Sequence, residues 1–390
     1  MNPKFKIASY IYPSDLVEPG GLGMLTLNMT RALAQSPEVQ LQLLVSRSDL
    51  GVDGMLPLSH PLWGIPCVGL PWRRRTREGC WLMFDRPLID RYLSPGTWVY
   101  NSAEPAYVPG RQCSRIVTVH HLEPFTSRLK ALRFRKAILT ADLLVAQSSF
   151  TRDQIVRDYG VARDRIVVVG SGVDERLFEE GEMEPKNVQP LQPYVVSVGA
   201  LLPRKGGDYL LRMARELQRR QSNLKIVCSA GQRGRPHLVE EARSLSNVVL
   251  LDYASREELI DLIRGAICMV IPSRLEGFGL TAIEAMALGT PLIASNNSAL
   301  PETLGGAGVL VNPEDAGQLA EEALRFQRDA SHRADYAERG RRRVSYFTWK
   351  ACMQRLLNGI REERERRLSR PGIGERAKRT GPSVKVTTSS

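Results

Sequence analysis

The chain has 390 residues, a length that suits two domains better than one. Hydrophobic residues make up 43% of it, which is normal for a globular protein and argues against general disorder. No apolar run is long enough to span a bilayer, and the first residues lack a signal-peptide core, so we expect a cytoplasmic protein. The six cysteines are scattered without a C-x-x-C pair, which predicts free thiols and neither disulfides nor a zinc site.

The formal net charge is +12, and half of it lies at the C-terminal end. Residues 366–390 hold 7 basic and 1 acidic side chains without apolar periodicity, which predicts a basic, disordered tail. Such a tail can contact an anionic membrane or nucleic acid, or it can be a solvated terminus. Because the excess charge is concentrated in the tail and not on a folded face, we expect no nucleic-acid partner.

Strand-like and helix-like segments alternate through the first half of the chain. The expected elements are a strand at 5–10, a helix at 22–35, strands at 41–46 and 115–120, a helix end and strand within 138–146, and a strand at 166–169. The apolar runs in these strands are typical of a parallel sheet that helices cover on both faces. Residues 1–182 are therefore predicted to form a Rossmann-like domain.

A polar, proline-containing stretch at 183–193 interrupts this alternation and is predicted to be the interdomain linker. The alternation then resumes with strands at 194–199, 224–229, 248–251, 267–271, 291–294 and 308–311, and with helices at 207–220, 257–265 and 280–288. Residues 194–345 are therefore predicted to form a second Rossmann-like domain.

Glycine-rich loops follow the first strand of each half. Gly21 lies between a strand and a helix whose first N–H groups can bind an anion, although the match to G-x-G-x-x-G is incomplete. In the second half, Gly199 ends the strand, and Arg204 and Lys205 follow beside further glycines. Two cations in this position suit a diphosphate. The alternative is that the first loop is a tight turn without a ligand and the second an exposed basic turn.

Two glutamates flank a Gly-Phe-Gly loop between an expected strand and an expected helix. Glu276 lies in the loop and Glu284 lies eight residues later, so both carboxylates can face one ligand. The N–H groups of Phe278, Gly279 and Leu280 stand at the helix start, where they can hold a phosphate. A carboxylate here can accept hydrogen bonds from sugar or ribose hydroxyls. The alternative, that both acids only stabilise the helix N-terminus, is weakened by the intervening glycines.

The stretch from Glu276 to Glu284 resembles the E-x7-E motif of the retaining glycosyltransferases of family 4, or glycosyl transferases group 1. Further segments match other motifs of that family in order and at normal spacing, namely 165–174 (I-x-V-I-P-N-G-V-D), 198–206 (V-G-R-L-x-x-x-K-G), 285–294 and 300–302. The resemblance implies an α/β protein of the GT-B fold, with two Rossmann-like domains facing across a cleft. It also implies that a C-terminal helix at 346–365 packs back on the first domain. Ser171 replaces the family's asparagine in the first of these segments.

The resemblance implies roles for the residues of the second domain. Arg204 and Lys205 would bind the donor diphosphate and stabilise the leaving charge. Glu276 would contact the transferred sugar, and Glu284 the ribose. The implied donor-binding positions are Gly21, Gly199, Phe278, Gly279, Leu280 and Glu284.

One histidine of the first domain also matches a family motif. His120 aligns with the histidine of the T-x-H-D segment near the reacting centre, which implies a catalytic role, whereas His121 replaces the usual aspartate. The alternative for His120 is a strand-end histidine that is hydrogen-bonded locally.

The implied reaction is sugar transfer with retention of anomeric configuration, from a GDP- or UDP-linked sugar. No D-x-D pair is present, which fits a metal-independent enzyme without a further cofactor. The stretch 295–302 is similar to bacterial polysaccharide mannosyltransferases and favours GDP-mannose, while a UDP-hexose stays open. We therefore expect transfer of a hexose to a glycan or lipid-linked acceptor in cell-surface polysaccharide synthesis.

The acceptor side of the first domain is harder to interpret. Residues 54–112 follow no clear pattern but contain four tryptophans and three consecutive arginines, namely Trp63, Trp72, Trp81, Trp98 and 73–75. They can hold a carbohydrate or a lipid-linked diphosphate, or they can be core aromatics beside a solvated turn. Residues 127–139 predict a basic amphipathic helix, which suggests peripheral contact with an anionic membrane at its inner face.

Two other kinds of function compete with a transferase. Another GT-B enzyme, such as an epimerase or a phosphorylase, is one, although no candidate appears for the pyridoxal-bearing lysine region of a phosphorylase. A non-catalytic sugar-nucleotide sensor or scaffold is the other. The intact set of Glu276, Glu284, Arg204 and Lys205 argues against lost activity.

Overall fold

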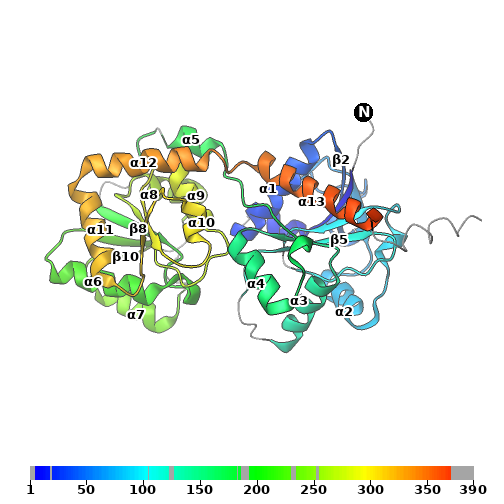
Figure 1. Ribbon diagram of the computed structural model, residues 1–390, viewed down its shortest axis with the longest axis horizontal. Coiled ribbons are helices and arrows are strands. Elements are labelled where there is room, and N and C mark those ends of the chain that lie inside the picture. The colour runs from blue at the N-terminus through cyan, green and yellow to red at the C-terminus, as the bar shows by residue number, and fades with distance from the viewer. Residues whose placement is uncertain are drawn as a thin grey trace, which may run out of the picture.

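Two α/β lobes make up the computed structural model, which describes residues 5–17, 20–103, 105–122, 127–181, 183–185, 193–229, 234–251 and 254–369 (Figure 1). Of the predicted linker, only 183–185 and 193 fall in this part of the chain. None of the helices in the described ranges is both long and apolar enough to cross a membrane. All six cysteines are free thiols, as expected.

The N-terminal lobe is built on a parallel sheet. Its strands in the described residues are β1 (Phe5–Tyr10), β2 (Val39–Ser46), β3 (Cys67–Leu70), β4 (Trp98–Asn101), β5 (Ser114–Val119), β6 (Leu143–Ala146) and β7 (Ile166–Val168). Its helices are α1 (Gly21–Gln35), α2 (Arg74–Phe84), α3 (Arg128–Thr140), α4 (Ser149–Tyr159) and α5 (Arg176–Glu180). The strand order is β3-β2-β1-β4-β5-β6-β7, and helices on both faces bury the apolar runs of the central strands.

The C-terminal lobe repeats this plan with a second parallel sheet. Its strands are β8 (Tyr194–Val198), β9 (Lys225–Ser229), β10 (Val248–Leu251), β11 (Met269–Ile271), β12 (Leu292–Ser295) and β13 (Val309–Val311). Its helices are α6 (Gly207–Arg219), α7 (Pro236–Ser244), α8 (Arg256–Arg264), α9 (Leu280–Ala287), α10 (Leu300–Leu304), α11 (Ala316–Arg328) and α12 (Ala330–Val344). The strand order is β10-β9-β8-β11-β12-β13.

Both sheets reverse their strand order beside the first strand. In the N-terminal lobe β1 lies between β2 and β4, and in the C-terminal lobe β8 lies between β9 and β11. At such a reversal the loops on either side run to opposite faces of the sheet and leave a crevice at the carboxyl ends of the strands. Each lobe therefore offers one crevice for a ligand, at the ends of β1 and β4 and at the ends of β8 and β11.

The region 54–112, for which no element was predicted, contains β3, α2 and β4. These strands have only four residues each, too few to show a period of two. Trp81 and Trp98 are core aromatics, which is one of the two alternatives stated for this region. Trp63 and Trp72 are exposed.

A long C-terminal helix, α13 (Trp349–Ser369), leaves the second lobe and lies against α1 of the first (Figure 1). Its apolar face joins the core of the N-terminal lobe through Cys352, Met353, Leu356, Leu357 and Ile360. The prediction ended this helix at 365 and started the tail at 366, which the structure corrects. Arg366 pairs with Asp164, and Arg367 pairs with Asp142 and Glu363, so the helix continues to its last described residue. Residues 370–390 of the predicted tail lie outside the described residues.

Replacing Leu356 by Ala is expected to lower the free energy of unfolding by about 2–5 kcal/mol, because Leu356 is fully buried between α13 and the first sheet. The measurement is urea unfolding followed by circular dichroism. Leu368→Ala on the same helix is the control, since that leucine is exposed, and it should change stability by less than about 0.5 kcal/mol. Equal losses in both variants would contradict the packing described here.

Candidate active site

A carboxylate and two cations meet at the carboxyl end of β11. Glu276 is buried, and one of its oxygens lies 2.6 Å from Lys205 Nζ and accepts a hydrogen bond from Ser273 Oγ at 2.8 Å. The other oxygen lies 3.5 Å from Arg204 Nη1. Burial alone would raise the pKa of the Glu276 carboxyl, but Lys205, Arg204 and Ser273 together hold this pKa below its usual value. Glu276 is therefore an ionised carboxylate in a charged cluster at neutral pH.

The loop that carries both cations packs tightly on β11. Gly206 has a φ of +72°, and a Cβ placed there would lie 2.0 Å from the Pro272 carbonyl oxygen. The Arg204 carbonyl accepts a hydrogen bond from Arg274 N at 2.9 Å. Only glycine permits this conformation and this close approach, which bring Lys205 to Glu276.

Gly277 connects this cluster to the N-terminal lobe. A Cβ on Gly277 would lie 1.8 Å from the His120 carbonyl oxygen, so the backbones of the two lobes touch at this point. The Gly277 carbonyl accepts hydrogen bonds from Ser148 Oγ at 2.7 Å and from Thr151 Oγ1 at 3.2 Å, at the start of α4. The lobes thus meet directly between the predicted catalytic residues His120 and Glu276.

His120 ends strand β5 with a buried imidazole. Its Nε2 lies 2.9 Å from the Ser102 carbonyl oxygen and 3.1 Å from that of Ala103, so Nε2 carries the proton and donates. Its Nδ1 has no hydrogen-bond partner among the described residues. Burial, with a smaller contribution from His121, lowers the pKa of His120 to about 4, against the raising effect of the two carbonyls. His120 is therefore neutral at pH 7, and its buried Nδ1 keeps an unused acceptor lone pair.

The residues after Gly277 form the start of α9. Gly279 has a φ of +99°, which turns the chain from the loop into the helix. The Phe278 carbonyl accepts a hydrogen bond from Thr303 Oγ1 at 2.5 Å. The Phe278 ring packs edge-on against the Phe347 ring, with 5.5 Å between the ring centres. The first N–H groups of α9, beginning at Leu280, have no partner within the helix and attract an anion.

A cavity of 530 Å³ lies between the lobes beside α9. Predicted donor-binding residues line it from both sides, with Gly21 of α1 on one side and Leu280 and Glu284 of α9 on the other. Glu284 is paired with Arg256 of α8 at 2.8 Å. The cavity therefore combines an anion-binding helix start with a carboxylate held by an arginine.

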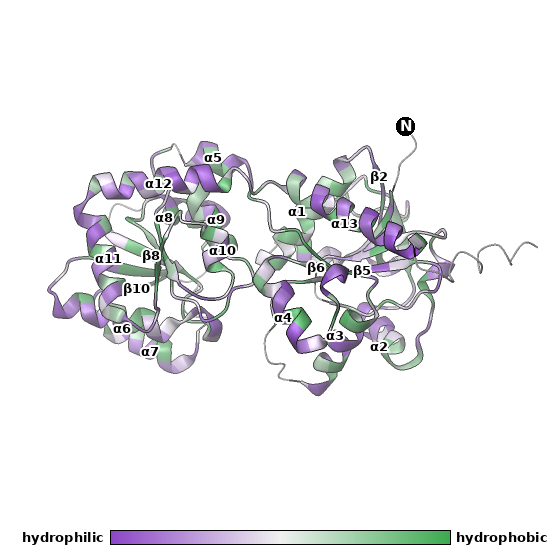
Figure 2. Cartoon of the chain, viewed as in Figure 1, coloured by the Kyte–Doolittle hydropathy of each residue, from purple (hydrophilic) through white to green (hydrophobic). Residues whose placement is uncertain are grey.

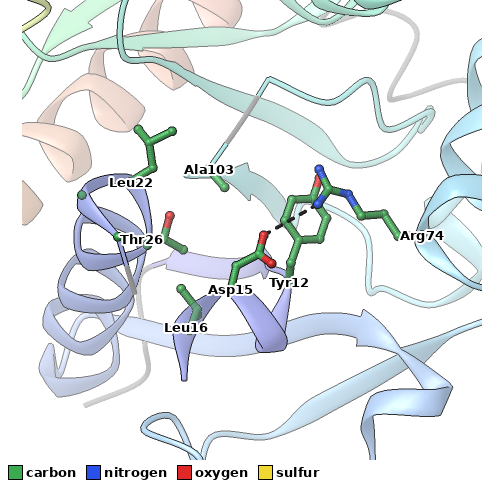
Figure 3. Close-up of a pocket in the computed structure, with 10 residues that line it drawn as sticks. Tyr12, Asp15, Leu16, Leu22, Thr26, Arg74 and Ala103 are labelled. Carbon is green, nitrogen blue, oxygen red and sulfur yellow. Dashed lines mark ion pairs between the residues drawn. The ribbon is translucent and has the colours of Figure 1, made fainter. Parts of the chain in front are cut away.

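A second cavity, of 400 Å³, continues from Gly21 into the N-terminal lobe (Figure 3). Arg74 lies over the ring of Tyr12, with the guanidinium carbon 3.3 Å from the ring centre. Its Nε lies 3.2 Å from Glu78, and its Nη1 lies 3.7 Å from Asp15. Thr26 also lines this cavity, although its hydroxyl oxygen is buried. The cavity therefore offers charged groups beside the interlobe space.

The structure thus brings the predicted site residues together as two neighbouring groups. Arg204, Lys205 and Glu276 form the charged cluster, which touches His120 through Gly277. Gly21, Leu280 and Glu284 line the interlobe cavity, and α9 joins both groups. Gly199, with a φ of +64°, turns the chain after β8, next to Val198 of the cavity wall.

Sequence reasoning did not identify three residues of this region. Arg256 forms an ion pair with Glu284 and is the first residue of α8. The signal that could have identified it is a basic residue soon after the carboxyl end of β10. Ser273 orients Glu276 and carries no sequence signal of its own. Glu302 lay in a recognised motif, but its role did not follow from it. Its carboxylate accepts hydrogen bonds from the backbone N–H groups of Ser149 at 2.9 Å and Phe150 at 3.4 Å. Glu302 therefore binds the N-terminus of α4 across the lobe boundary.

Both lobes match described protein families. Residues 19–177 match the family model Glycosyltransferase Family 4, and residues 179–343 match Glycosyl transferases group 1. Together the matches cover nearly all residues from α1 to α12.

Several curated proteins are similar to the chain. O-antigen chain mannosyltransferase B of Escherichia coli is 27% identical over 65% of this chain and 72% of its own length. D-inositol 3-phosphate glycosyltransferase of Rhodococcus jostii is 32% identical over 58% of this chain and 54% of its own. MMP alpha-(1->4)-mannosyltransferase of Mycolicibacterium hassiacum is 33% identical over 53% and 51%. The match therefore spans only about half the length of the last two proteins.

Solved structures resemble the whole arrangement of the two lobes. Sucrose-phosphate synthase from Thermosynechococcus elongatus superposes with a TM-score of 0.68, at 20% identity, over 93% of this chain and all of its own. Anabaena HepE in complex with UDP-glucose gives a TM-score of 0.67, at 16% identity, over 91% and 99%. At these identities the likeness concerns the fold. The protein therefore belongs to the glycosyltransferases of family 4, has their GT-B fold, and is an enzyme that transfers a sugar.

Proposed function

We propose that the protein is a retaining hexosyltransferase that moves a hexose from a nucleotide sugar to a glycan or lipid-linked acceptor in cell-surface polysaccharide synthesis. The observation that carries this proposal is the cluster of Glu276, Lys205 and Arg204 just before α9, the helix whose Leu280 and Glu284 line the interlobe cavity. GDP-mannose is the first donor candidate, because two similar proteins are named mannosyltransferases. A UDP-linked hexose is the alternative.

The donor would lie across the C-terminal lobe with its diphosphate at the start of α9. Lys205 and Arg204 would bind the diphosphate, and their charge would stabilise the negative charge that develops as it leaves. The backbone of Phe278, Gly279 and Leu280 would contribute helix-start N–H groups. In the structure Lys205 binds Glu276, so donor binding would share this cation between the carboxylate and the diphosphate.

Transfer breaks the bond between the anomeric carbon and the phosphate oxygen, and the electron pair leaves with the diphosphate. The acceptor hydroxyl oxygen forms the new bond on the same face of the sugar, and its proton passes to the leaving phosphate. Glu276 would hold the hydroxyls of the transferred sugar in place, because its own position is set by three neighbouring donors. Glu284 would bind the ribose, with Arg256 orienting its carboxylate.

His120 would act by accepting a hydrogen bond. Its neutral, buried Nδ1 faces no protein donor in the described chain, so a hydroxyl of the donor sugar or of the acceptor would fill this position once substrate binding opens it. A protonated imidazole could not accept this bond. His120 thus contributes to binding and orientation and does not supply a proton.

The acceptor would enter from the N-terminal lobe through the cavity of Tyr12, Asp15, Thr26 and Arg74, which adjoins the donor cavity at Gly21. Hydroxyl groups of a sugar can bind Asp15, while Arg74 suits an oxygen-rich or anionic substituent. A lipid-linked acceptor is held in a membrane, so the proposal includes a cytoplasmic enzyme in peripheral contact with the inner face.

Nucleotide release from a panel of GDP- and UDP-sugars tests the assignment. We expect one donor to be used, with release at least about 100-fold slower in Lys205→Ala and Glu276→Gln, because each removes an aimed charge from the site. Lys6→Ala and Glu338→Gln are matched controls with exposed side chains and should behave like the native enzyme. If no nucleotide sugar is bound, the assignment as a transferase fails, and binding without release in the presence of glycan acceptors would favour the non-catalytic scaffold.

The neutral state of His120 predicts a pH effect. Its pKa is about 4 in the folded protein and near 6.5 in the unfolded chain, so the unfolded state takes up the proton first as the pH falls. The free energy of unfolding is therefore expected to fall by up to roughly 3 kcal/mol as the pH drops from 6.5 to 4. Urea unfolding at several pH values should show a shallower loss in His120→Gln. The exposed His237→Gln is the control, and an unchanged pH dependence in His120→Gln would disprove the assignment.

A further inference from the structure

We propose that the exposed side of α3, together with the end of α2, is a docking surface for an anionic lipid bilayer. This α2–α3 surface consists of five exposed apolar residues, Met83, Phe84, Leu129, Leu132 and Leu139, and of three exposed basic residues, Arg128, Lys130 and Arg135. It lies on the N-terminal lobe, where the acceptor cavity also lies.

The leucines of α3 point away from the core. Only Ala137 and Ile138 are fully buried in this helix, whereas Leu129 and Leu132 are 57% and 54% exposed. Arg128, Leu132, Arg135 and Leu139 follow each other at spacings of three and four residues and so form one stripe along the helix. The leucines of a surface helix in a globular protein normally face the core. The exposed leucines of this stripe therefore indicate contact with an apolar environment outside the chain.

The end of α2 extends the apolar area of this surface. Met83 and Phe84 are each 70% exposed. Lys136 of α3 donates to the Leu82 carbonyl at 3.0 Å and pairs with Asp85 at 2.8 Å, so the end of α2 is fixed beside α3. Figure 2 shows hydrophobic and hydrophilic residues interleaved on these neighbouring helices. The end of α2 therefore adds two exposed apolar residues next to α3.

The charge of α3 is suited to anionic lipid. The helix contains five basic residues and no acidic one. Arg133 pairs with Glu78 and Lys136 pairs with Asp85. The other three basic residues, Arg128, Lys130 and Arg135, are exposed beside the leucines. Arginine and lysine can keep their charges at the lipid headgroups while neighbouring leucines enter the acyl boundary.

The mixing of charge and apolar residues favours a bilayer over a protein partner. Arginines alternate with leucines along the same stripe. A protein partner would have to match each leucine with an apolar group and each arginine with a carboxylate in the same order. A headgroup layer satisfies both kinds of side chain at once.

The position of the surface suits an acceptor held in the membrane. Arg128 follows His120 by eight residues, so the two lie at most roughly 29 Å apart. Buried Glu78 binds both Arg133 of α3 and Arg74 of the acceptor cavity. Only the biological role of this surface rests on the proposed lipid-linked acceptor. Binding of the surface to a bilayer requires neither donor nor acceptor.

The test is co-sedimentation of the full chain with vesicles of phosphatidylglycerol and phosphatidylcholine, compared with phosphatidylcholine alone. We expect binding only to the anionic vesicles, weakened by added salt. Leu132→Glu/Leu139→Glu should lower the partition coefficient at least about 10-fold, through lost apolar insertion and through repulsion of the added carboxylates by the anionic lipid. Arg128→Glu/Arg135→Glu should lower it by at least roughly 30-fold, because the loss of each basic residue alone lowers binding about fivefold.

Matched controls separate this surface from general charge effects. Leu58→Glu and Arg325→Glu/Arg328→Glu change exposed residues elsewhere and should bind like the native chain. Nucleotide release by Leu132→Glu/Leu139→Glu in the absence of vesicles should equal that of the native chain, which keeps the membrane contact separate from catalysis. The proposal fails if the native chain does not bind, or if both α3 variants bind as well as it does. It also fails if native chains dimerise in light scattering and Leu132→Glu/Leu139→Glu does not.

Discussion

The contact between the Gly277 backbone and the His120 carbonyl determines how the two halves of the active site face each other. No side chain fits at Gly277, because its Cβ would overlap the His120 oxygen. Hydrogen bonds from Ser148 and Thr151 to the Gly277 carbonyl fix the same peptide. The carboxylate of Glu276 is therefore set next to the N-terminal lobe by its own backbone.

The charged cluster and the lobe contact depend on one another. Lys205 reaches Glu276 only because Gly206 lets its loop approach Pro272, and Glu276 stays ionised because Lys205 and Arg204 outweigh its burial. An ionised, oriented carboxylate beside two cations at a helix start would suit the diphosphate sugar of the proposed function. Preorganised charges of this kind would need little rearrangement when the leaving group departs, which lowers the barrier to transfer.

Much of the fold and part of the site could be predicted from the sequence. Two Rossmann-like domains followed from alternating strands and helices, and the confirmed GT-B fold followed from the resemblance to family 4. The segment from Glu276 to Glu284 could be located because its strand, glycine loop and helix start are consecutive. Arg256 escaped prediction because it reaches Glu284 from another strand end. The short strand β4 escaped because four residues show no period. Contacts that depend on how two lobes meet, such as that of Glu302 with α4, have no local signal.

The central claim is that the donor diphosphate lies at the start of α9, between Lys205 and the lobe contact. A crystal structure of the protein with GDP or UDP tests it most directly. The account predicts that the diphosphate contacts Lys205 and the N–H groups of Phe278 to Leu280, with the ribose at Glu284. A diphosphate bound instead in the cavity of Tyr12 and Arg74 in the N-terminal lobe would contradict it.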